Sequence, residues 1–311
     1  MKKFLKIAGI ILFILILLGF SAKKILLDYS SVPDKSDITL TAGELRDLAG
    51  NTGPLPVKIN VLRVGVGEFL PGMVVAGERN KKYSAPFFAY QVVYGGNLPG
   101  GGNTVIIDAA MDRSQTKMMK GDVQFDDAAY GALQKGMKKA AAIILTHEHF
   151  DHAGGIAKSP FFGDIMGKTL FTDEQMASPI ILEAGFTGDM LAKCKKLTYD
   201  RVHVLFPGMV LVKTPGHTPG HQMVYVKLEN GGEYLIAGDI AWHTDNITLL
   251  KQRPVIVSLF LGENRGNVGN QLRWLHDLTV DHSEIHVLVY HDKAQHDGLV
   301  KGGLLGRGFE F

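Results

Sequence analysis

Only one cysteine, Cys194, occurs among the 311 residues, so the chain cannot form an internal disulfide. The lysines at positions 193, 195 and 196 would favour its thiolate somewhat. A lone cysteine without an identified base partner is nevertheless more often inert than nucleophilic. We therefore expect no catalytic role for Cys194, and no disulfide reports the compartment in which the chain resides.

Neither sign of charge predominates in the chain. The chain has 33 Lys and Arg against 31 Asp and Glu, which gives a formal net charge of +2. No basic stripe interleaved with aromatic residues is present, and because polyphosphate substrates usually demand a basic track, nucleic acid is not an expected partner. Sequence repeats, low-complexity tracts and internal linkers are absent as well. These absences favour a single folded body.

One long hydrophobic run is present at residues 7–22, which carry no charge. We expect residues 1–22 to be a membrane anchor, and the alternatives are a signal peptide cleaved after Ser21 or a buried core helix. Three lysines precede the run and two follow it, which by the positive-inside tendency places the body outside the cytoplasm. The predicted location is the cell envelope, or secreted or periplasmic if the leader is cleaved.

Residues 23–56 are polar and are expected to form a stalk or a strap, in which a capping-box pattern from Thr41 to Glu44 would start a short helix. Residues 57–311 are expected to form the catalytic domain. Within it the hydrophobic patterns alternate between strands and helices, which predicts a mixed α and β fold. The predicted strands are 59–66, 88–94, 104–108, 141–145, 202–206, 209–214, 223–228, 234–237 and 285–290, and the predicted helices are 126–139 and 269–278.

The most informative motif is His-x-His-x-Asp-His, which runs from His147 to His152 directly after a strand-like apolar run. In a chain that is still extended, His147 and His149 would project to the same side and offer one metal ion two imidazoles. Asp151 and His152 follow where the chain must turn, and a glycine pair just beyond allows close backbone approach. We therefore expect a second ion beside the first.

More ligand-type residues stand at the ends of later apolar segments, where a sheet delivers side chains to one edge. They are His217, His221, Asp239 and His291. A mixed nitrogen and oxygen donor set suits zinc, with manganese, cobalt or iron as the other options. Two such cations would lower the pKa of a shared water to about 7 and supply hydroxide as the nucleophile at neutral pH.

This set of residues resembles the metallo-β-lactamase superfamily over roughly residues 57–300. The resemblance implies an α/β fold, a four-layer αββα sandwich with the metals at one edge of the two sheets. It also implies a catalytic role for Asp151 and Asp239. The implied ligands are His147, His149 and His217 for one metal, Asp151, His152 and His291 for the other, and Asp239 as the bridge. Asp108 stands where the family usually keeps an aspartate that orients a ligand histidine, but Ala109-Ala110 replaces the Thr-Gly or Ser-Gly that commonly follows.

Within the superfamily, the segment from Thr214 to Gln222 and the late Tyr290-His291-Asp292 are most similar to the acyl-homoserine lactonases and their relatives. Those lactonases typically carry a tyrosine three residues after the bridging aspartate, where its hydroxyl assists the carbonyl. This chain has Trp242 there. An indole N–H donates a hydrogen bond but cannot act as a phenolic acid.

Three other residues and one loop are candidates for a role at the site. Glu148 should point away from the ligands on strand alternation, and we do not expect it to be the general base. His221 is expected to contact the site from behind the ligands rather than to bind metal. His243 is interpreted either as a proton donor to the product or as a surface histidine. The loop at 67–86 is apolar, and we expect it either to lean over the metals or to pack on the body or the membrane.

Together these observations predict a binuclear metal-dependent hydrolase that uses a metal-bound hydroxide on a carbonyl ester, a lactone or another small hydrophobic ester. The enzymatic alternatives are a thioesterase of the glyoxalase II kind and a β-lactamase. The alternative from another class is a membrane-tethered metal-binding module without turnover. The expected partners are a small-molecule substrate and, through the N-terminal segment, a membrane.

Overall fold

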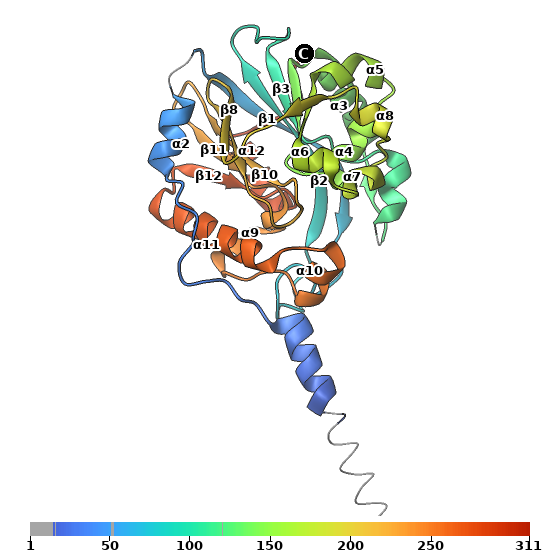
Figure 1. Cartoon of the computed structure of the whole chain (residues 1–311), viewed down its shortest axis with the longest axis vertical. Helices are drawn as coiled ribbons and strands as arrows, with labels where there is room; N and C mark the ends of the chain where they lie inside the picture. Colours follow the sequence, from blue (N-terminus) through green and yellow to red (C-terminus); the bar gives the residue numbers. More distant parts are fainter. Residues whose placement is uncertain (1–14, 16, 51–52, 120) are drawn as a thin grey trace, which may run out of the picture.

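The computed structural model describes residues 15, 17–50, 53–119 and 121–311, and within them the strands form two sheets (Figure 1). The larger sheet has the order β13-β1-β2-β3-β5-β6-β7, with β4 paired to β1. Its strands are β1 (Pro56–Glu68), β2 (Ser84–Tyr94), β3 (Thr104–Ile107), β4 (Gln124–Phe125), β5 (Ala142–Ile144), β6 (Thr169–Thr172), β7 (Lys195–Leu197) and β13 (Gly306–Arg307). The smaller sheet has the order β12-β11-β10-β9-β8. Its strands are β8 (Val202–Phe206), β9 (Met209–Lys213), β10 (Gln222–Lys227), β11 (Glu233–Ile236) and β12 (Ile285–Leu288).

Helices and single helical turns join the strands. The α-helices are α2 (Ala42–Ala49), α3 (Asp127–Lys139), α4 (Phe150–Ala157), α5 (Phe162–Ile165), α6 (Asp173–Ala177), α7 (Ile180–Glu183), α8 (Gly188–Leu191), α9 (Thr244–Thr248), α10 (Val255–Leu261), α11 (Arg265–Asp281) and α12 (Lys293–Lys301). The other helical segments are η1 (Lys24–Asp28), η2 (Arg113–Met118), η3 (Met166–Lys168) and η4 (Gly238–Ile240).

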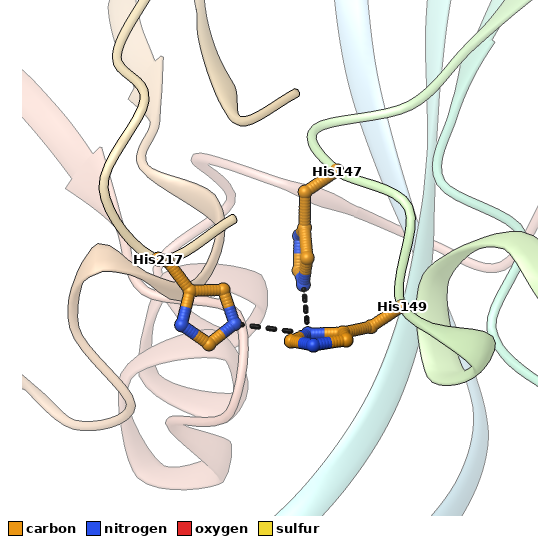
Figure 2. Close-up of side chains that lie close together, drawn as sticks. All are labelled: His147, His149 and His217. Atoms are coloured by element: carbon orange, nitrogen blue, oxygen red, sulfur yellow. Dashed lines mark hydrogen bonds between the residues drawn. The ribbon is translucent and has the colours of Figure 1, made fainter. Parts of the chain in front are cut away.

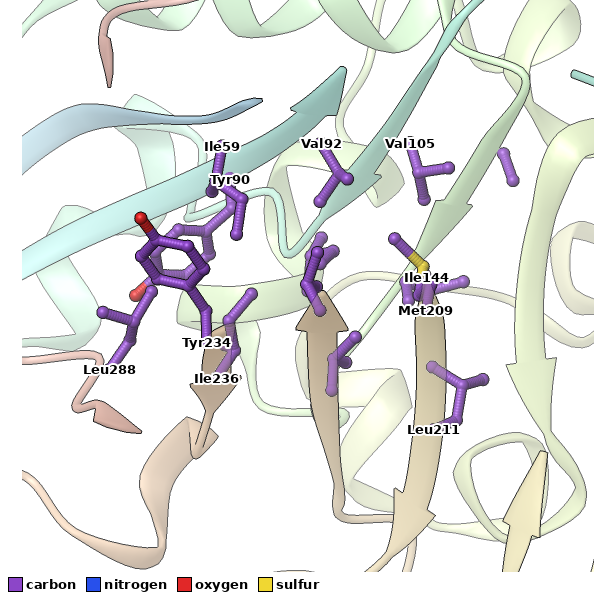
Figure 3. Packing of buried hydrophobic residues seen from close by; sticks show 14 of the residues in the cluster. Ile59, Tyr90, Val92, Val105, Ile144, Met209, Leu211, Tyr234, Ile236 and Leu288 are labelled. Carbon is purple, nitrogen blue, oxygen red and sulfur yellow. The ribbon is translucent and has the colours of Figure 1, made fainter. Parts of the chain in front are cut away.

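The central core lies between the two sheets (Figure 3). Val92 and Val105 of the larger sheet belong to the same buried cluster as Leu211 and Ile236 of the smaller one. Full burial of one such aliphatic side chain is worth about 1.5–3 kcal/mol, so the inward-facing residues of both sheets hold the layers together.

Two further cores cover the outer faces of the sheets. On the larger sheet, Leu133 of α3 and Ile156 of α4 pack with Phe87 and Ile106. On the smaller sheet, α2 and α11 supply Leu45 and Leu272, among others. Helices therefore flank both sheets, and the predicted αββα arrangement is confirmed.

Most strands predicted in the body are present, with ends that differ by a few residues. The chief differences are short elements that the hydrophobic pattern did not reveal: β6, β7, β13 and α12. The predicted strand 141–145 is shorter in the structure, since β5 ends at Ile144. The predicted capping box is confirmed, because Thr41 Oγ1 accepts a hydrogen bond from Glu44 N at 3.1 Å and Thr41 N donates to Glu44 Oε2 at 2.9 Å.

Most of the predicted membrane segment lies outside the described residues. Residues 17–23 are helical and stand off from the body (Figure 1). No helix in the described part of the chain combines the length and the apolar character needed to cross a membrane.

The glycine pair after the histidine motif lets α4 press against the loop that follows β3. A Cβ atom on Gly155 would lie 2.0 Å from Ala109 O. With glycine there, Gly155 N donates to Ala110 O at 3.2 Å and Ala109 N donates to His152 O at 2.7 Å. This close approach fixes the start of α4 relative to the end of β3.

We expect Gly155→Ala to lower the free energy of unfolding by about 1–3 kcal/mol, because the added methyl group meets a backbone carbonyl that cannot move away. Urea unfolding measures the effect. The matched control is Gly131→Ala in α3, where a Cβ atom meets nothing within 4 Å and helix propensity should add about 0.5–1 kcal/mol. Equal stability of the two variants would contradict the tight contact at Gly155.

Candidate metal centre

The predicted histidine motif lies in the loop and helix that follow β5. His147 and His149 belong to the loop, and Asp151 and His152 lie in the first turn of α4. Strand β5 ends at Ile144, but the backbone of His149, the residue before α4, is still extended, with φ of −63° and ψ of 154°, as predicted. The two imidazoles meet, and His147 Nε2 lies 2.9 Å from His149 Nδ1 (Figure 2).

Three further side chains reach the same place from the ends of strands in the smaller sheet. His217 follows β9, Asp239 follows β11 and His291 follows β12, as predicted. His217 Nε2 lies 3.0 Å from His149 Nδ1 (Figure 2) and 3.6 Å from Asp239 Oδ2. His291 Nε2 lies 3.3 Å from the same carboxylate oxygen. The structure therefore brings all seven predicted site residues into one cluster.

The nitrogen and oxygen atoms of this cluster form three overlapping groups, each with its atoms within 4.8 Å of one another. The groups are His147, His149 and His217; His147, His152 and Asp239; and Asp151, His152 and His291. Asp239 lies between the first and the third group. Its Oδ2 is 4.0 Å from His147 Nε2, and its Oδ1 is 3.4 Å from His152 Nε2.

Two buried polar atoms of the cluster indicate which kind of ligand it would bind. His152 Nε2 and Asp239 Oδ1 have no hydrogen-bond partner among the described residues. Leaving such a buried group unsatisfied costs about 1–3 kcal/mol, and more for a charged one. A divalent cation would satisfy both atoms, and a set of imidazoles and carboxylates is the donor set that zinc accepts. The residues present therefore fit a metal site.

Burial and neighbouring charges set the protonation of these groups. Burial lowers the pKa of His147 and His149 well below the ordinary value, which favours the neutral imidazole that binds metal. Burial also disfavours the charged form of His152, but the carboxylates of Asp108 and Asp239 outweigh it and hold the pKa of His152 well above the ordinary value. His291 and His152 hold the pKa of Asp239 well below its usual range despite burial.

Asp108 orients one of the candidate ligands from behind. Its Oδ2 lies 3.0 Å from His152 Nδ1 and accepts from Thr146 Oγ1 at 2.8 Å, while its Oδ1 accepts from Thr146 N at 2.7 Å. The backbone of Asp108 is left-handed, with φ of 59°, which turns the chain off β3 and aims the carboxylate at this loop. The alanines that follow Asp108 thus do not prevent the contact that the resemblance implies.

Glu263 supports His217 in the same way, and no sequence pattern pointed to it. Glu263 Oε1 lies 2.6 Å from His217 Nδ1 and also pairs with the buried guanidinium of Arg253. Burial works against the glutamate charge, but Arg253 and His217 hold the pKa of Glu263 far below its usual range. The carboxylate therefore stays charged, and it fixes the ring so that Nε2 faces the cluster.

Glu148 and His221 also take supporting positions. Glu148 points away from the cluster, as predicted, and accepts from Thr218 Oγ1 at 2.7 Å and from Gly220 N at 3.2 Å. His221 Nε2 accepts from the backbone N–H of Asp239 at 3.2 Å, and its Nδ1 lies 3.0 Å from Thr214 Oγ1. Both nitrogens are therefore used in holding Asp239 and the loop after β9.

Trp242 and the loop at 67–86 close one side of the cluster. Trp242 Nε1 donates to Asp239 Oδ2 at 2.8 Å, and Phe69 stacks on the indole with ring centroids 4.5 Å apart. Phe69 also meets the edge of His291 at 5.2 Å. Val74 and Val75 are buried with Tyr83 of the same loop, next to Phe69 and Trp242, and Val74 O accepts from Asn246 Nδ2 of the body at 2.8 Å. The loop thus does both of the things expected of it, since one end leans over the cluster and the middle packs on the body.

His243 lies beside this region rather than in the cluster. Its Nδ1 accepts from Asp245 N at 3.1 Å, and its Nε2 lies 3.4 Å from Asp292 Oδ2. The ring is partly exposed, so the two predicted interpretations, a proton donor and a surface histidine, both stay open.

Comparison with known proteins agrees with this geometry. Residues 86–161, which include the histidine motif, match the family model of the metallo-beta-lactamase superfamily. A solved N-acyl homoserine lactone hydrolase, with the product N-hexanoyl-L-homoserine bound at its catalytic metal centre, shares the fold. The TM-score is 0.60 at 17% identity, over 78% of this chain and 96% of that one.

Two curated relatives match about a third of the chain in sequence. The N-acyl homoserine lactonase of Bacillus thuringiensis subsp. kurstaki is 32% identical over 109 residues, which are 33% of this chain and 40% of the lactonase. The hydroxyacylglutathione hydrolase of Buchnera aphidicola subsp. Schizaphis graminum is 31% identical over 107 residues, 34% of this chain and 36% of that enzyme. The match therefore spans well under half the length of either relative.

We expect Asp108→Asn to weaken zinc binding by roughly 10–100-fold, because the amide keeps the shape but removes the charge that holds His152. Competition with a chromophoric chelator measures the affinity. Asp126→Asn is the matched control, since Asp126 caps α3 away from the cluster and asparagine caps a helix equally well. Unchanged affinity in the Asp108 variant would contradict the orienting role.

Proposed function

We propose that this chain is a binuclear metal-dependent hydrolase of carbonyl esters, acting on a lactone or another small hydrophobic ester. The observation that supports it best is the position of Asp239, whose carboxylate lies close to buried histidines of both outer groups. Its Oδ2 is 3.6 Å from His217 Nε2 and 3.3 Å from His291 Nε2, and its Oδ1 is 3.4 Å from His152 Nε2. A purely structural cluster would not need partnerless polar atoms at its centre.

In this proposal one cation is held by His147, His149 and His217, and a second by Asp151, His152 and His291, with Asp239 shared. Zinc is the proposed metal, with manganese, cobalt or iron as substitutes that the donor set accepts. Two such cations, when bound, supply Lewis-acid activation of water and of a substrate carbonyl at neutral pH.

Side chains around the cluster orient the candidate metal ligands. Asp108 and Glu263 hold two of the histidine rings, and the indole of Trp242 holds Oδ2 of Asp239. Phe69 covers His291 and keeps that side of the cluster apolar. These contacts fix the donor atoms before a substrate arrives, so binding does not have to reorder them.

The apolar surroundings support a hydrophobic ester as the substrate. Phe69, whose ring contacts His291, lines an open groove of about 460 Å³ together with the apolar Leu70 and Pro71 and the polar Glu68, Asp122 and Gln124. The indole N–H of Trp242 is engaged by Asp239, so no phenolic acid assists the carbonyl here as the tyrosine does in the lactonases. The proposed reaction therefore relies on the metal centre alone for polarisation of the carbonyl.

A thioesterase is the second candidate, and the match to a hydroxyacylglutathione hydrolase favours it. An ester and a thioester that share the same acyl group distinguish the two proposals. A higher kcat/KM for the thioester would replace the lactone proposal.

We also propose that the chain resides in the cell envelope, attached through residues 1–22. The uncharged run at 7–22 supports this location, and the lysine balance around it supports a body outside the cytoplasm.

We expect chelation to abolish ester hydrolysis and zinc to restore it, and Asp239→Asn to lower kcat/KM by about 100-fold or more, because both groups of donors lose the shared charge. The assay uses the full chain with lactones, thioesters, phosphodiesters and cephalosporins. Asp297→Asn, a surface aspartate paired with Arg63 and Lys293, is the matched control. Hydrolysis of none of these substrates would favour a binding module without turnover.

We expect Trp242→Phe to lower kcat/KM by about 10-fold, because it keeps the stacking on Phe69 but removes one hydrogen bond to a charged carboxylate, worth about 1.5–3 kcal/mol. Steady-state kinetics on the zinc-loaded protein measure the change. Trp274→Phe is the matched control, since that indole donates to Leu40 O, far along the chain from the site. Full activity of the Trp242 variant would show that Asp239 needs no such support.

A further inference from the structure

Helix α10 exposes apolar side chains to the surface and buries its polar one. Ile256, Leu259 and Phe260, which are three and four residues apart on one face, are 43%, 68% and 88% exposed. The helix's one polar side chain, Ser258, is buried and accepts from Arg265 Nη1 at 2.7 Å. A helix that turns serine inward and phenylalanine outward presents its apolar face to something other than water.

This face adjoins the base of the N-terminal helix. Segment η1 packs against α10, and Gln252 N, just before α10, donates to Ser30 Oγ at 2.9 Å. Figure 1 shows the N-terminal helix leaving the body beside α10. Its described apolar side chains are also exposed, namely Leu15, Leu17, Leu18, Phe20 and Ile25. We call the exposed apolar side chains of α10 and of the adjoining N-terminal helix the α10 surface.

Basic side chains surround the α10 surface. They are Lys23, Lys24, Arg79, Lys81 and Lys82, all exposed. Arg79 pairs with Asp28 and Lys81 pairs with Asp245, so the excess positive charge comes from Lys23, Lys24 and Lys82. An apolar face with a basic border matches the order of a bilayer, in which acyl chains lie beneath anionic headgroups.

We propose that the α10 surface lies on a lipid bilayer. The uncharged run at 7–22 overlaps in sequence with the helical residues 17–23, and the next segment, η1, packs against α10. Insertion of that run would therefore bring Leu259 and Phe260 to the level of the headgroups. This inference rests on the proposed membrane attachment, but it does not depend on which bond the chain hydrolyses.

The surface also lies close to the candidate metal centre. Arg253 and Glu263, on either side of α10, hold His217, and Gly77 N in the loop at 67–86 donates to Leu27 O of η1 at 3.0 Å. A bilayer on this face would border the segments that surround the cluster.

The test places a tryptophan in the surface. Full-length Phe260→Trp is reconstituted into vesicles of phosphatidylcholine and phosphatidylglycerol, with or without brominated acyl chains, and flotation confirms attachment. A face that enters the headgroup boundary by about 5–10 Å should lose about half of the added fluorescence to the bromine atoms. The unmodified chain gives the background of Trp242 and Trp274, and Val280→Trp, at a 66% exposed position of α11, is the matched control.

Quenching at position 260 but not at position 280 supports the proposal. A chain that floats with the vesicles but shows no quenching at position 260 overturns it and leaves the membrane attachment standing, whereas a chain that does not float overturns both. If Phe260→Glu instead dissociates a dimer seen by light scattering, the surface is covered by a second copy of the chain and the lipid proposal is wrong. None of these readouts depends on hydrolytic activity.

Discussion

The carboxylate of Asp239 sits at the centre of a buried cluster in which its two oxygens face different histidines, one of them left without a hydrogen-bond partner among the described residues. Five imidazoles and two carboxylates gathered in the interior would be costly to fold unless something compensates their polarity. The surrounding structure is therefore suited to bind a positively charged ligand. The contacts around the cluster, such as Asp108 with His152 and Trp242 with Asp239, keep the donor atoms turned toward that ligand.

The architecture gathers these residues from segments far apart in the sequence. Strand ends of both sheets meet at one edge of the sandwich, so a loop after β5 and loops after β9, β11 and β12 deliver side chains to the same point. The cores between and outside the sheets hold those strand ends in place. The contact of Gly155 with Ala109 adds a local constraint, because it ties the first turn of α4 to the chain that carries Asp108.

Much of the fold and of the cluster could be predicted, because the signals are local. The pattern from His147 to His152 is contiguous, and His217 and His291 each follow an apolar run that had to be a strand. Glu263 could not be found, because it is an isolated glutamate whose contact with His217 exists only in the folded chain. The extended backbone expected at His149 is present, but the start of α4 one residue later could not be placed, because helix propensity alone does not mark it. The membrane segment stays a prediction, because its residues lie largely outside those described.

The buried ion pair of Arg253 and Glu263 brackets α10 within a span of eleven residues. Glu263 pairs with Arg253 and also contacts His217, so its carboxylate connects the end of α10 to the imidazole ring. A displacement of α10 would pull on the carboxylate and change the angle at which the ring meets the centre of the site. Arg253 Nη2 also lies 3.4 Å from His217 Nδ1, and Asn264 N donates to Gly216 O at 2.8 Å, so both ends of this exposed apolar helix are connected to the loop that carries a candidate ligand.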